Sequence, residues 1–368
     1  MKINIIDPGL FHQAGHHLDL DIKVCKVLKN LGHDIAIYSS INVTDKIKSF
    51  FEHYGEVTPI FKAIPYFNVE NIDRLAGGYI AFNRQSKILA EDFTKVASAD
   101  LWLFPSIFCA QLNACAISGS KTPIAGCIHL SATKEYAQDE MFWRYALINC
   151  KDRSIELNLG VMEPEHLMEY QKIASNDFEI ISFPIPYEGV PIERPRKTLR
   201  KVGFFGHQRD EKGIHLVAKL TDLLTKKGYE IVIQDSTESF KSTGYSNVTI
   251  LGYVANIALE ISKCDCVILP YNPIKYQTKG SGILWDALAS GVPVIAPVGT
   301  AIGRWIQYCG SGRLFHEFDV NSIIHQFELL SENYDEYVSI AIKNASIWSV
   351  KHGIDKFVSS LLNFKKSC

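Results

Sequence analysis

The chain has 368 residues, which predicts roughly two domains at about 150 residues each and excludes a peptide or mini-protein. It carries 38 Lys and Arg residues against 40 Asp and Glu residues, so its formal net charge is −2. This balance argues against a nucleic-acid partner, because a dedicated binder neutralises phosphates with an excess of cations.

The cysteines and the hydropathy pattern indicate the compartment. The nine cysteines are an odd number without the paired C-x-x-C spacing of structural zinc sites, which favours a reducing compartment. The apolar run in the opening MKINIIDPGL is too short for a signal peptide, and no window approaches the roughly 18 apolar residues of a membrane span. We therefore expect a soluble, cytoplasmic protein.

The first half of the chain reads as strands that alternate with helices. A buried strand at Ile3–Ile6 is followed by a polar loop and then by a helical spacing of apolar residues from Leu18 to Leu31. A second strand at Ile35–Tyr38 completes a β-loop-α-β unit, the building block of a parallel sheet covered by helices. Further strands are expected at Leu101–Phe104 and Ile124–Ile128.

The second half repeats this architecture after a proline-rich stretch. Prolines at 184, 186, 191 and 195 are too many for a helix or a central strand, so we interpret this stretch as the interdomain linker. After it, the sequence predicts a strand, a loop, a helix and a strand, at Lys201–Phe205, Gly206–Gly213, Ile214–Leu224 and Glu230–Gln234. A C-terminal helical segment from Val338 to Phe364 is interrupted at Gly353. The prediction is two Rossmann-like doubly wound α/β domains, at 1–185 and 186–345, facing a cleft.

The strongest candidate for chemistry is the turn Lys279-Gly280-Ser281-Gly282, which precedes a helix from about Ile283. Glycines at a helix start let a ligand approach the backbone, and the unpaired N–H groups and the helix dipole favour an anion. Asp286 follows within the first helical turns, where its carboxylate can accept hydrogen bonds from ribose hydroxyls. The alternative is a plain strand-to-helix turn.

Three further groups follow expected strands. The loop Gly206–Gly213 contains Arg209 and Lys212, two cations suited to a diphosphate, although they could instead pair with the neighbouring Asp210 and Glu211. His129 follows a strand and can donate to a substrate, or simply bond a nearby backbone group. In Gly15-His16-His17 the adjacent histidines point apart and no carboxylate has facial-triad spacing, so we expect no metal site.

Together these residues resemble the retaining glycosyltransferases of GT-B fold, in particular family four, the group 1 glycosyl transferases. The frame from Gly206 to Lys212-Gly213 is similar to the loop that holds the donor diphosphate in that family, with His207 in place of the usual arginine. The run from Asp286 to Pro293 is similar to the family's second glutamate and its continuation, whereas Thr278 or Lys279 stands where the first glutamate is usual.

The resemblance implies roles for individual residues. Arg209 and Lys212 would stabilise the leaving diphosphate, and His129 would contact the donor sugar near the reacting carbon. The remaining donor-binding positions that it implies are Gly15, His16, Gly206, His207, Tyr253, Val254, Lys279, Gly280, Ser281, Gly282 and Asp286. The C-terminal helix, residues 346–368, would cross back to the N-terminal acceptor-side domain.

The implied activity is transfer of a sugar, of the hexosyltransferase type, from a nucleoside diphosphate sugar to a hydroxyl of a carbohydrate or lipid-linked acceptor, with retention. We expect no metal and no cofactor besides this co-substrate. The alternatives are a non-catalytic nucleotide-sugar-binding subunit and a sugar-nucleotide epimerase of the same fold. The aromatic and basic segment Lys46–Tyr66 is a candidate for peripheral contact with the inner membrane face, or else a core-facing helix with a solvated edge.

Overall fold

The computed structural model describes residues 1–12, 16–64, 77–132, 139–175, 177–190, 197–235, 240, 244–252, 254 and 256–364. The chain divides into two compact units. The first comprises Met1–Pro186 together with Ile354–Cys368, and the second comprises Tyr187–Gly353. We expected the chain to leave the second domain at 345, but it stays in the second unit up to Gly353, because helix α12 (Tyr334–Lys351) packs there on α9 (Gly282–Ser290).

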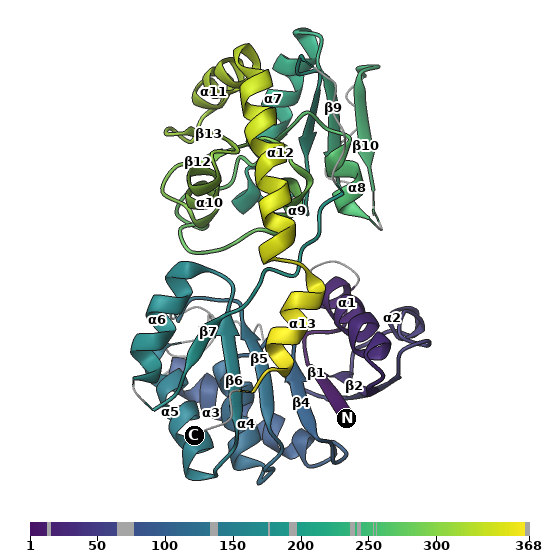
Figure 1. Cartoon of the computed structure of the whole chain (residues 1–368), viewed down its shortest axis with the longest axis vertical. Helices are drawn as coiled ribbons and strands as arrows, with labels where there is room; N and C mark the ends of the chain where they lie inside the picture. Colours follow the sequence, from purple (N-terminus) through teal and green to yellow (C-terminus); the bar gives the residue numbers. More distant parts are fainter. Residues whose placement is uncertain are drawn as a thin grey trace. The chain divides into compact units, whose positions relative to one another are not determined.

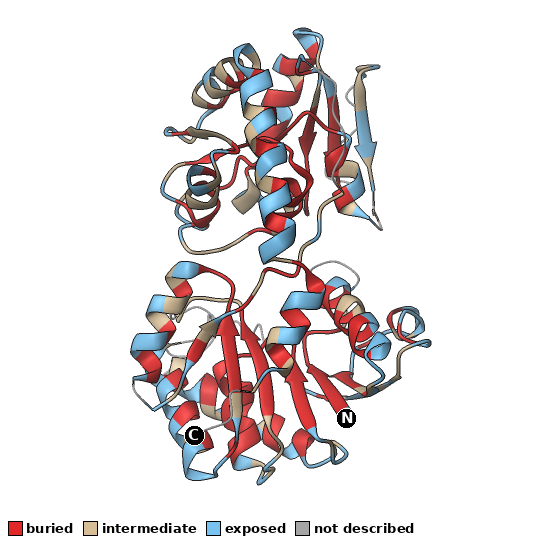
Figure 2. Cartoon of the chain, in the orientation of Figure 1, coloured by how far each residue is buried: buried red, intermediate tan, exposed pale blue. Residues whose placement is uncertain are grey.

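The first unit contains a parallel sheet with the strand order β3-β2-β1-β4-β5-β6-β7 among the described residues. The inner strands are buried along nearly their whole length, as expected where helices cover both faces of a parallel sheet (Figure 2). The strands are β1 (Lys2–Asp7), β2 (Asp34–Ser40), β3 (Glu56–Phe61), β4 (Leu101–Phe104), β5 (Ile124–Ile128), β6 (Leu157–Val161) and β7 (Ile180–Ser182).

Helices lie on both faces of this sheet (Figure 1). On one face α3, α4 and α5 pack in succession, and on the other α13 packs on α1 and on strands β5 and β6. The helices of the unit are α1 (His16–Asn30), α2 (Asp45–Ser49), α3 (Gly77–Phe93), α4 (Cys109–Ile117), α5 (Glu140–Asp152), α6 (Pro164–Ala174) and α13 (Ile354–Leu362).

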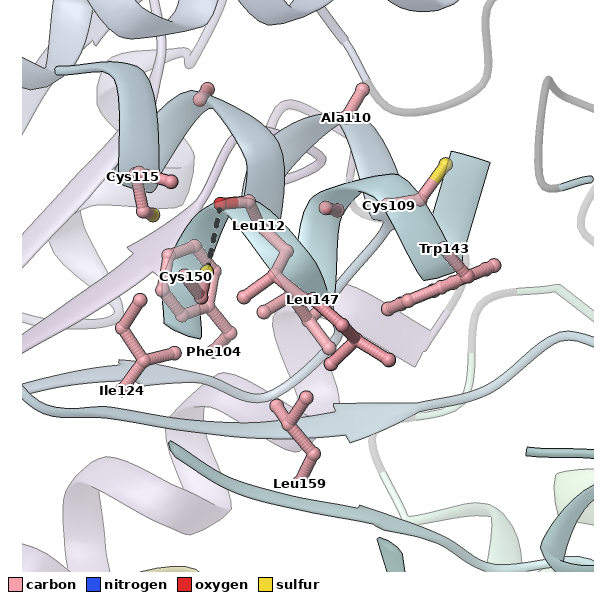
Figure 3. Close-up of a cluster of buried hydrophobic side chains, with 14 of the residues drawn as sticks. Phe104, Cys109, Ala110, Leu112, Cys115, Ile124, Trp143, Leu147, Cys150 and Leu159 are labelled. Carbon is pink, nitrogen blue, oxygen red and sulfur yellow. Dashed lines mark hydrogen bonds between the residues drawn. The ribbon is translucent and has the colours of Figure 1, made fainter. Parts of the chain in front are cut away.

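The core of the first unit lies between the sheet and α4 and α5 (Figure 3). Phe104, Ile124 and Leu159 of three adjacent strands face Leu112 of α4 and Leu147 of α5. The same layer holds the thiols of three fully buried cysteines, of which Cys150 donates to the carbonyl oxygen of Leu112 over 3.7 Å. Burial raises the pKa of the Cys150 thiol to about 12, so it stays protonated and behaves as a small apolar group.

The C-terminal helix α13 is anchored to the first unit by specific contacts. The side-chain amide of Asn158 in β6 donates to the carbonyl oxygens of Ser360 and Leu361, over 2.8 and 2.9 Å. The rings of Phe183 and Phe357 meet edge to face, with their centroids 5.9 Å apart. The expected break at Gly353 is present, because α12 ends at Lys351 and α13 begins at Ile354.

The second unit contains a parallel sheet with the order β10-β9-β8-β11-β12-β13 among the described residues. Its hydrophobic core is formed by side chains of these strands and of α7, α11 and α12. The strands are β8 (Lys201–Phe204), β9 (Glu230–Gln234), β10 (Val248–Leu251), β11 (Cys266–Ile268), β12 (Val294–Pro297) and β13 (Gly312–Phe315). Besides α9 and α12, the helices are α7 (Ile214–Lys226), α8 (Ile257–Ser262), α10 (Ala301–Cys309) and α11 (Val320–Glu332), with a 3₁₀ turn at Asp210–Lys212.

Candidate active site

The loop after β8 is held by the end of the neighbouring strand β9. Gly206 has a φ of +95°, and its backbone N–H donates to Oε1 of Gln234 over 2.8 Å. The side-chain amide of Gln208 donates to the carbonyl oxygens of Gly206 and Gln234, over 3.1 and 2.9 Å. The start of this loop is therefore fixed at the carboxyl edge of the sheet, where open α/β folds bind their ligands.

Lys212 is the last residue of the 3₁₀ turn, and its side chain extends back toward Gly206 at the start of the loop. Its Nζ lies 5.2 Å from the ring centroid of Tyr271, and a methyl group at Gly206 would come within 2.7 Å of the same Nζ. Burial lowers the pKa of Lys212 below its ordinary value, and the charge of Arg209 adds to the effect. The ammonium forms no ion pair with any residue that the structure describes, although the desolvation of a cation is costly unless an anion approaches it.

Arg209 is placed differently from Lys212. Its guanidinium forms an ion pair with Glu211, which is also within 3.5 Å of the Tyr276 hydroxyl. The alternative that the sequence left open, pairing with a neighbouring carboxylate, is thus correct for Arg209 and wrong for Lys212. His207 is exposed in the same loop, and burial together with the charges of Arg209 and Lys212 lowers the pKa of its imidazole.

The first turn of α9 meets the same loop. A methyl group at Gly206 would lie 3.3 Å from the side chain of Ile283, in the first turn of this helix. Ser281, at the N-cap, makes no side-chain capping bond, and its hydroxyl lies 3.4 Å from that of Tyr271. The N–H groups of the first helical turn have no acceptor within the helix. The Lys212 ammonium and the positive end of α9 therefore converge beside Gly206.

A contact within the protein explains why residue 282, the first of α9, is a glycine. A methyl group at Gly282 would come within 2.6 Å of the hydroxyl oxygen of Tyr187, so a protein side chain takes the space that we expected to be left for a ligand. Lys279 and Gly280 are half-buried in the preceding loop. Asp286 is only 3% exposed in the second turn of α9, and its contact with a ribose stays a prediction.

In the first unit His129 follows β5, as expected. Its Nε2–H donates to the carbonyl oxygen of Pro105 over 2.8 Å, which makes Nδ1 the acceptor nitrogen of the neutral ring. Burial lowers the pKa of His129 to about 4, so the ring is neutral at neutral pH. The bond to a backbone carbonyl was the simpler alternative for this residue, and it is present.

A buried acidic cluster at the end of β1 was not predicted. The Asp7 carboxylate accepts from Nδ1 of His17 and from the N–H of Gly9, both over 2.7 Å. The pKa of Asp21 is raised well above its ordinary value. Burial is the larger cause, and repulsion by the adjacent Asp7 carboxylate is the second. The sequence signal for this cluster is an aspartate on the inward-facing stripe of α1, between Leu18 and Cys25, where the spacing demands apolar residues.

Several predicted positions are not tested by these contacts. Gly15 and Tyr253 lie outside the described residues, as does the side chain of His16. Val254 is described and half-buried. In the segment Lys46–Tyr66, of which residues 65 and 66 lie outside the described part of the chain, Phe51 and Phe61 are fully buried in the first unit. This favours a core-facing segment over a membrane surface, but the expected helix is wrong for Phe61, which ends strand β3. None of the described helices is long and apolar enough to cross a bilayer.

Comparison with known proteins bears on both units. Residues 199–333 match the family model described as glycosyl transferases group 1. The matched residues include Gly206, Lys212 and the first turn of α9, so the convergence described above lies within the part of the chain that is similar to this family. Comparison with curated protein sequences gives no match.

Solved structures match nearly the whole chain. The glycosyltransferase SnogD from Streptomyces nogalater is 17% identical with a TM-score of 0.63, covering 98% of each chain. Sucrose-phosphate synthase from Thermosynechococcus elongatus is 12% identical with a TM-score of 0.67, covering 98% of this chain and 97% of its own. Anabaena HepE in complex with UDP is 14% identical with a TM-score of 0.65, covering 98% of each chain. The likeness shows that the chain has the GT-B fold of two parallel α/β sheets.

Proposed function

We propose that this protein is a glycosyltransferase that moves a sugar from a nucleoside diphosphate sugar to an acceptor hydroxyl, with retention of the anomeric configuration. One observation carries the proposal. The half-buried ammonium of Lys212 has no carboxylate partner among the described residues and lies beside the N-terminus of α9, within the residues that match the group 1 glycosyl transferase model. A cation and a helix terminus together form a site for a diphosphate.

The chemistry follows from the charge that develops on the leaving group. The bond between the anomeric carbon and the β-phosphate oxygen breaks, and the acceptor oxygen bonds to the anomeric carbon on the same face. The proton of the acceptor hydroxyl passes to the departing phosphate oxygen, so the products are the glycoside and a nucleoside diphosphate. Lys212 and the N–H groups of α9 stabilise the charge of this diphosphate as it leaves.

The other residues that the sequence predicts for the site have more limited support. Arg209 forms an ion pair with Glu211, so it can bind the diphosphate only if this ion pair breaks. His129, with Nδ1 as an acceptor, is suited to receive a hydrogen bond from a hydroxyl of the sugar or the acceptor. UDP is bound in a structure of HepE, and thymidine diphosphate in that of the spinosyn rhamnosyltransferase SpnG, which is consistent with a nucleotide donor here.

A non-catalytic nucleotide-sugar-binding subunit is the second candidate. The pairing of Arg209 with Glu211 favours it, because one cation fewer is then available to the leaving group. Binding of a nucleoside diphosphate would be the same for both candidates. Only the enzyme would release the nucleoside diphosphate faster in the presence of a sugar acceptor.

The test is a turnover assay with a panel of uridine, guanosine, adenosine and thymidine diphosphate sugars and a set of carbohydrate and lipid-linked acceptors. We expect release of one nucleoside diphosphate, and proton NMR of the product should show the anomeric configuration of the donor. A chelator should leave the rate unchanged, since we propose a hexosyl transfer without a metal. Tight donor binding without release under any acceptor would favour the binding subunit, and an inverted product would contradict retention.

A further inference from the structure

The first residues of the second unit, from Tyr187 to Val190, run along α9. At one end of this helix the ring of Tyr187 lies against Gly282, and its centroid is 5.2 Å from that of Trp285. At the other end the backbone N–H of Val190 donates to Oγ of Ser290 over 3.2 Å. We call Tyr187–Val190 the entry segment. Its contacts span α9 from the first turn to the last.

The last residues of the second unit, from Trp348 to Gly353, contact the same segment. The indole N–H of Trp348, near the end of α12, donates to the carbonyl oxygen of Tyr187 over 3.0 Å. A methyl group at Gly353, the last residue of the unit, would lie 3.0 Å from the Glu188 carboxylate. We call Trp348–Gly353 the exit segment. Tyr187 therefore contacts the first turn of α9 with its ring and the exit segment with its carbonyl group.

We propose that Tyr187 is a positioning residue that holds the first turn of α9 in place for the diphosphate and couples occupation of that turn to the entry and exit segments. This inference rests on the proposed function, because it takes the α9 terminus as the diphosphate site. A bound diphosphate accepts from the N–H groups of the first turn, and the ring of Tyr187 packs on Gly282 in that turn. Fixing the turn thus fixes the ring and, through its carbonyl, Trp348.

The close approach of Tyr187 to Gly282 allows a double-mutant test of positioning. Gly282→Ala adds a methyl group in the space of the Tyr187 hydroxyl, so it should weaken binding of UDP and inorganic pyrophosphate roughly tenfold, as contacting pairs allow. In the background of Tyr187→Ala the same change should have less than about a twofold effect, because the clash is gone. Equal effects in both backgrounds, measured by calorimetry, would overturn the positioning role.

The conservative variant separates positioning from general stability. Tyr187→Phe keeps the ring against Gly282 and Trp285 and should bind UDP within about twofold of the wild type, whereas Tyr187→Ala should bind more weakly. Tyr229→Ala is the matched control. It removes a half-buried tyrosine of the same unit that directly precedes the amino end of β9 and whose ring centroid lies 4.9 Å from that of Phe327. Equal weakening of UDP binding by Tyr229→Ala and Tyr187→Ala would also overturn the proposal.

Hydrogen exchange with mass spectrometry tests the coupling. UDP or pyrophosphate should slow exchange in the entry and exit segments of the wild type and of Tyr187→Phe, but not in the exit segment of Tyr187→Ala at saturating ligand. Binding by the wild type without slower exchange in the exit segment would overturn the coupling and leave the proposed function intact. Absence of any binding of UDP and pyrophosphate to the wild type would overturn the diphosphate site itself, and this inference with it.

Discussion

The ammonium of Lys212 lies over the ring of Tyr271, with Nζ 5.2 Å from the ring centroid. Burial raises the pKa of Tyr271 to about 12, so at neutral pH this ring holds the lysine without neutralising its charge. An aromatic partner of this kind positions a cation and leaves it able to attract an anion. This distinguishes Lys212 from Arg209, whose guanidinium already forms an ion pair with Glu211.

The first prediction is a pH dependence of diphosphate binding. Burial lowers the pKa of Lys212, so the free protein loses this charge at a lower pH than an ordinary lysine would. Affinity for a nucleoside diphosphate should therefore fall in the alkaline range, as pH rises through the lowered pKa of Lys212. Lys212→Arg should bind without this fall, because arginine stays charged. Calorimetric titrations from pH 7 upwards check this, and a parallel fall in both proteins would contradict it.

The second prediction concerns the glycine that follows the 3₁₀ turn. Gly213 has a φ of +73°, and a methyl group there would collide with the carbonyl group of Pro270. Gly213→Ala should lower the free energy of unfolding by about 3 kcal/mol or more. Gly228→Ala is the control, since its φ is +89° but no atom lies within 4 Å of the added methyl, and it should cost only about 1 kcal/mol. Equal losses in urea titrations would contradict the collision.

The third prediction concerns the acidic cluster at the end of β1. Because the pKa of Asp21 is raised, the folded protein binds this proton up to a higher pH than the unfolded chain does. The free energy of unfolding therefore falls as pH rises from 3.8, the ordinary pKa, through the raised pKa of the folded state.

Asp21→Asn keeps a donor toward Asp7 and cannot ionise, so it should raise the stability at pH 8 by an amount on the order of 1 kcal/mol and flatten the pH profile. Asp19→Asn on the same helix removes an exposed carboxylate, paired with Lys23, and should leave the profile nearly unchanged. The measurement is urea denaturation at several pH values. A destabilised Asp21→Asn at pH 8 would show that the ionised pair is favourable.

The fourth prediction concerns the protonation of His129. With a pKa of about 4 and Nε2–H bonded to the Pro105 carbonyl, this ring should be neutral from about pH 5 upwards, with its proton on Nε2. Nitrogen-15 NMR of the histidine side chains, assigned with His129→Gln, distinguishes the two tautomers and the charged form. A doubly protonated ring at pH 6 would contradict the assigned environment.

Several inner strands of both sheets were predicted from the sequence, whereas the edge strands and the inner strand β6 were not. Strands β4, β5 and β9 coincide with apolar runs, because strands covered on both faces need continuous hydrophobic side chains. The edge strands β10 and β13 are only partly buried, and each contains a polar residue, so neither shows the continuous apolar run of an inner strand. Edge strands of this kind are assigned only by their pairing with a neighbour.

The candidate site was predictable to the extent that it follows strands. The loop after β8 and the start of α9 were both expected, because glycines and cations after a strand mark the ligand edge of a sheet. The choice of Lys212 over Arg209 as the available cation depends on Tyr271 and Glu211, which are selected by tertiary packing. The contact of Tyr187 with Gly282 joins distant parts of the sequence, and no local pattern indicates it.

The most direct test of the account is calorimetric titration of the wild type, Lys212→Ala and Lys219→Ala with uridine, guanosine, adenosine and thymidine diphosphates. Lys219 is an exposed lysine on α7 and serves as the control. We expect one nucleotide to bind the wild type and Lys219→Ala equally, and Lys212→Ala roughly 10- to 100-fold more weakly, the value of a hydrogen bond to a charged group. Unchanged affinity in a folded Lys212→Ala protein would contradict the diphosphate site.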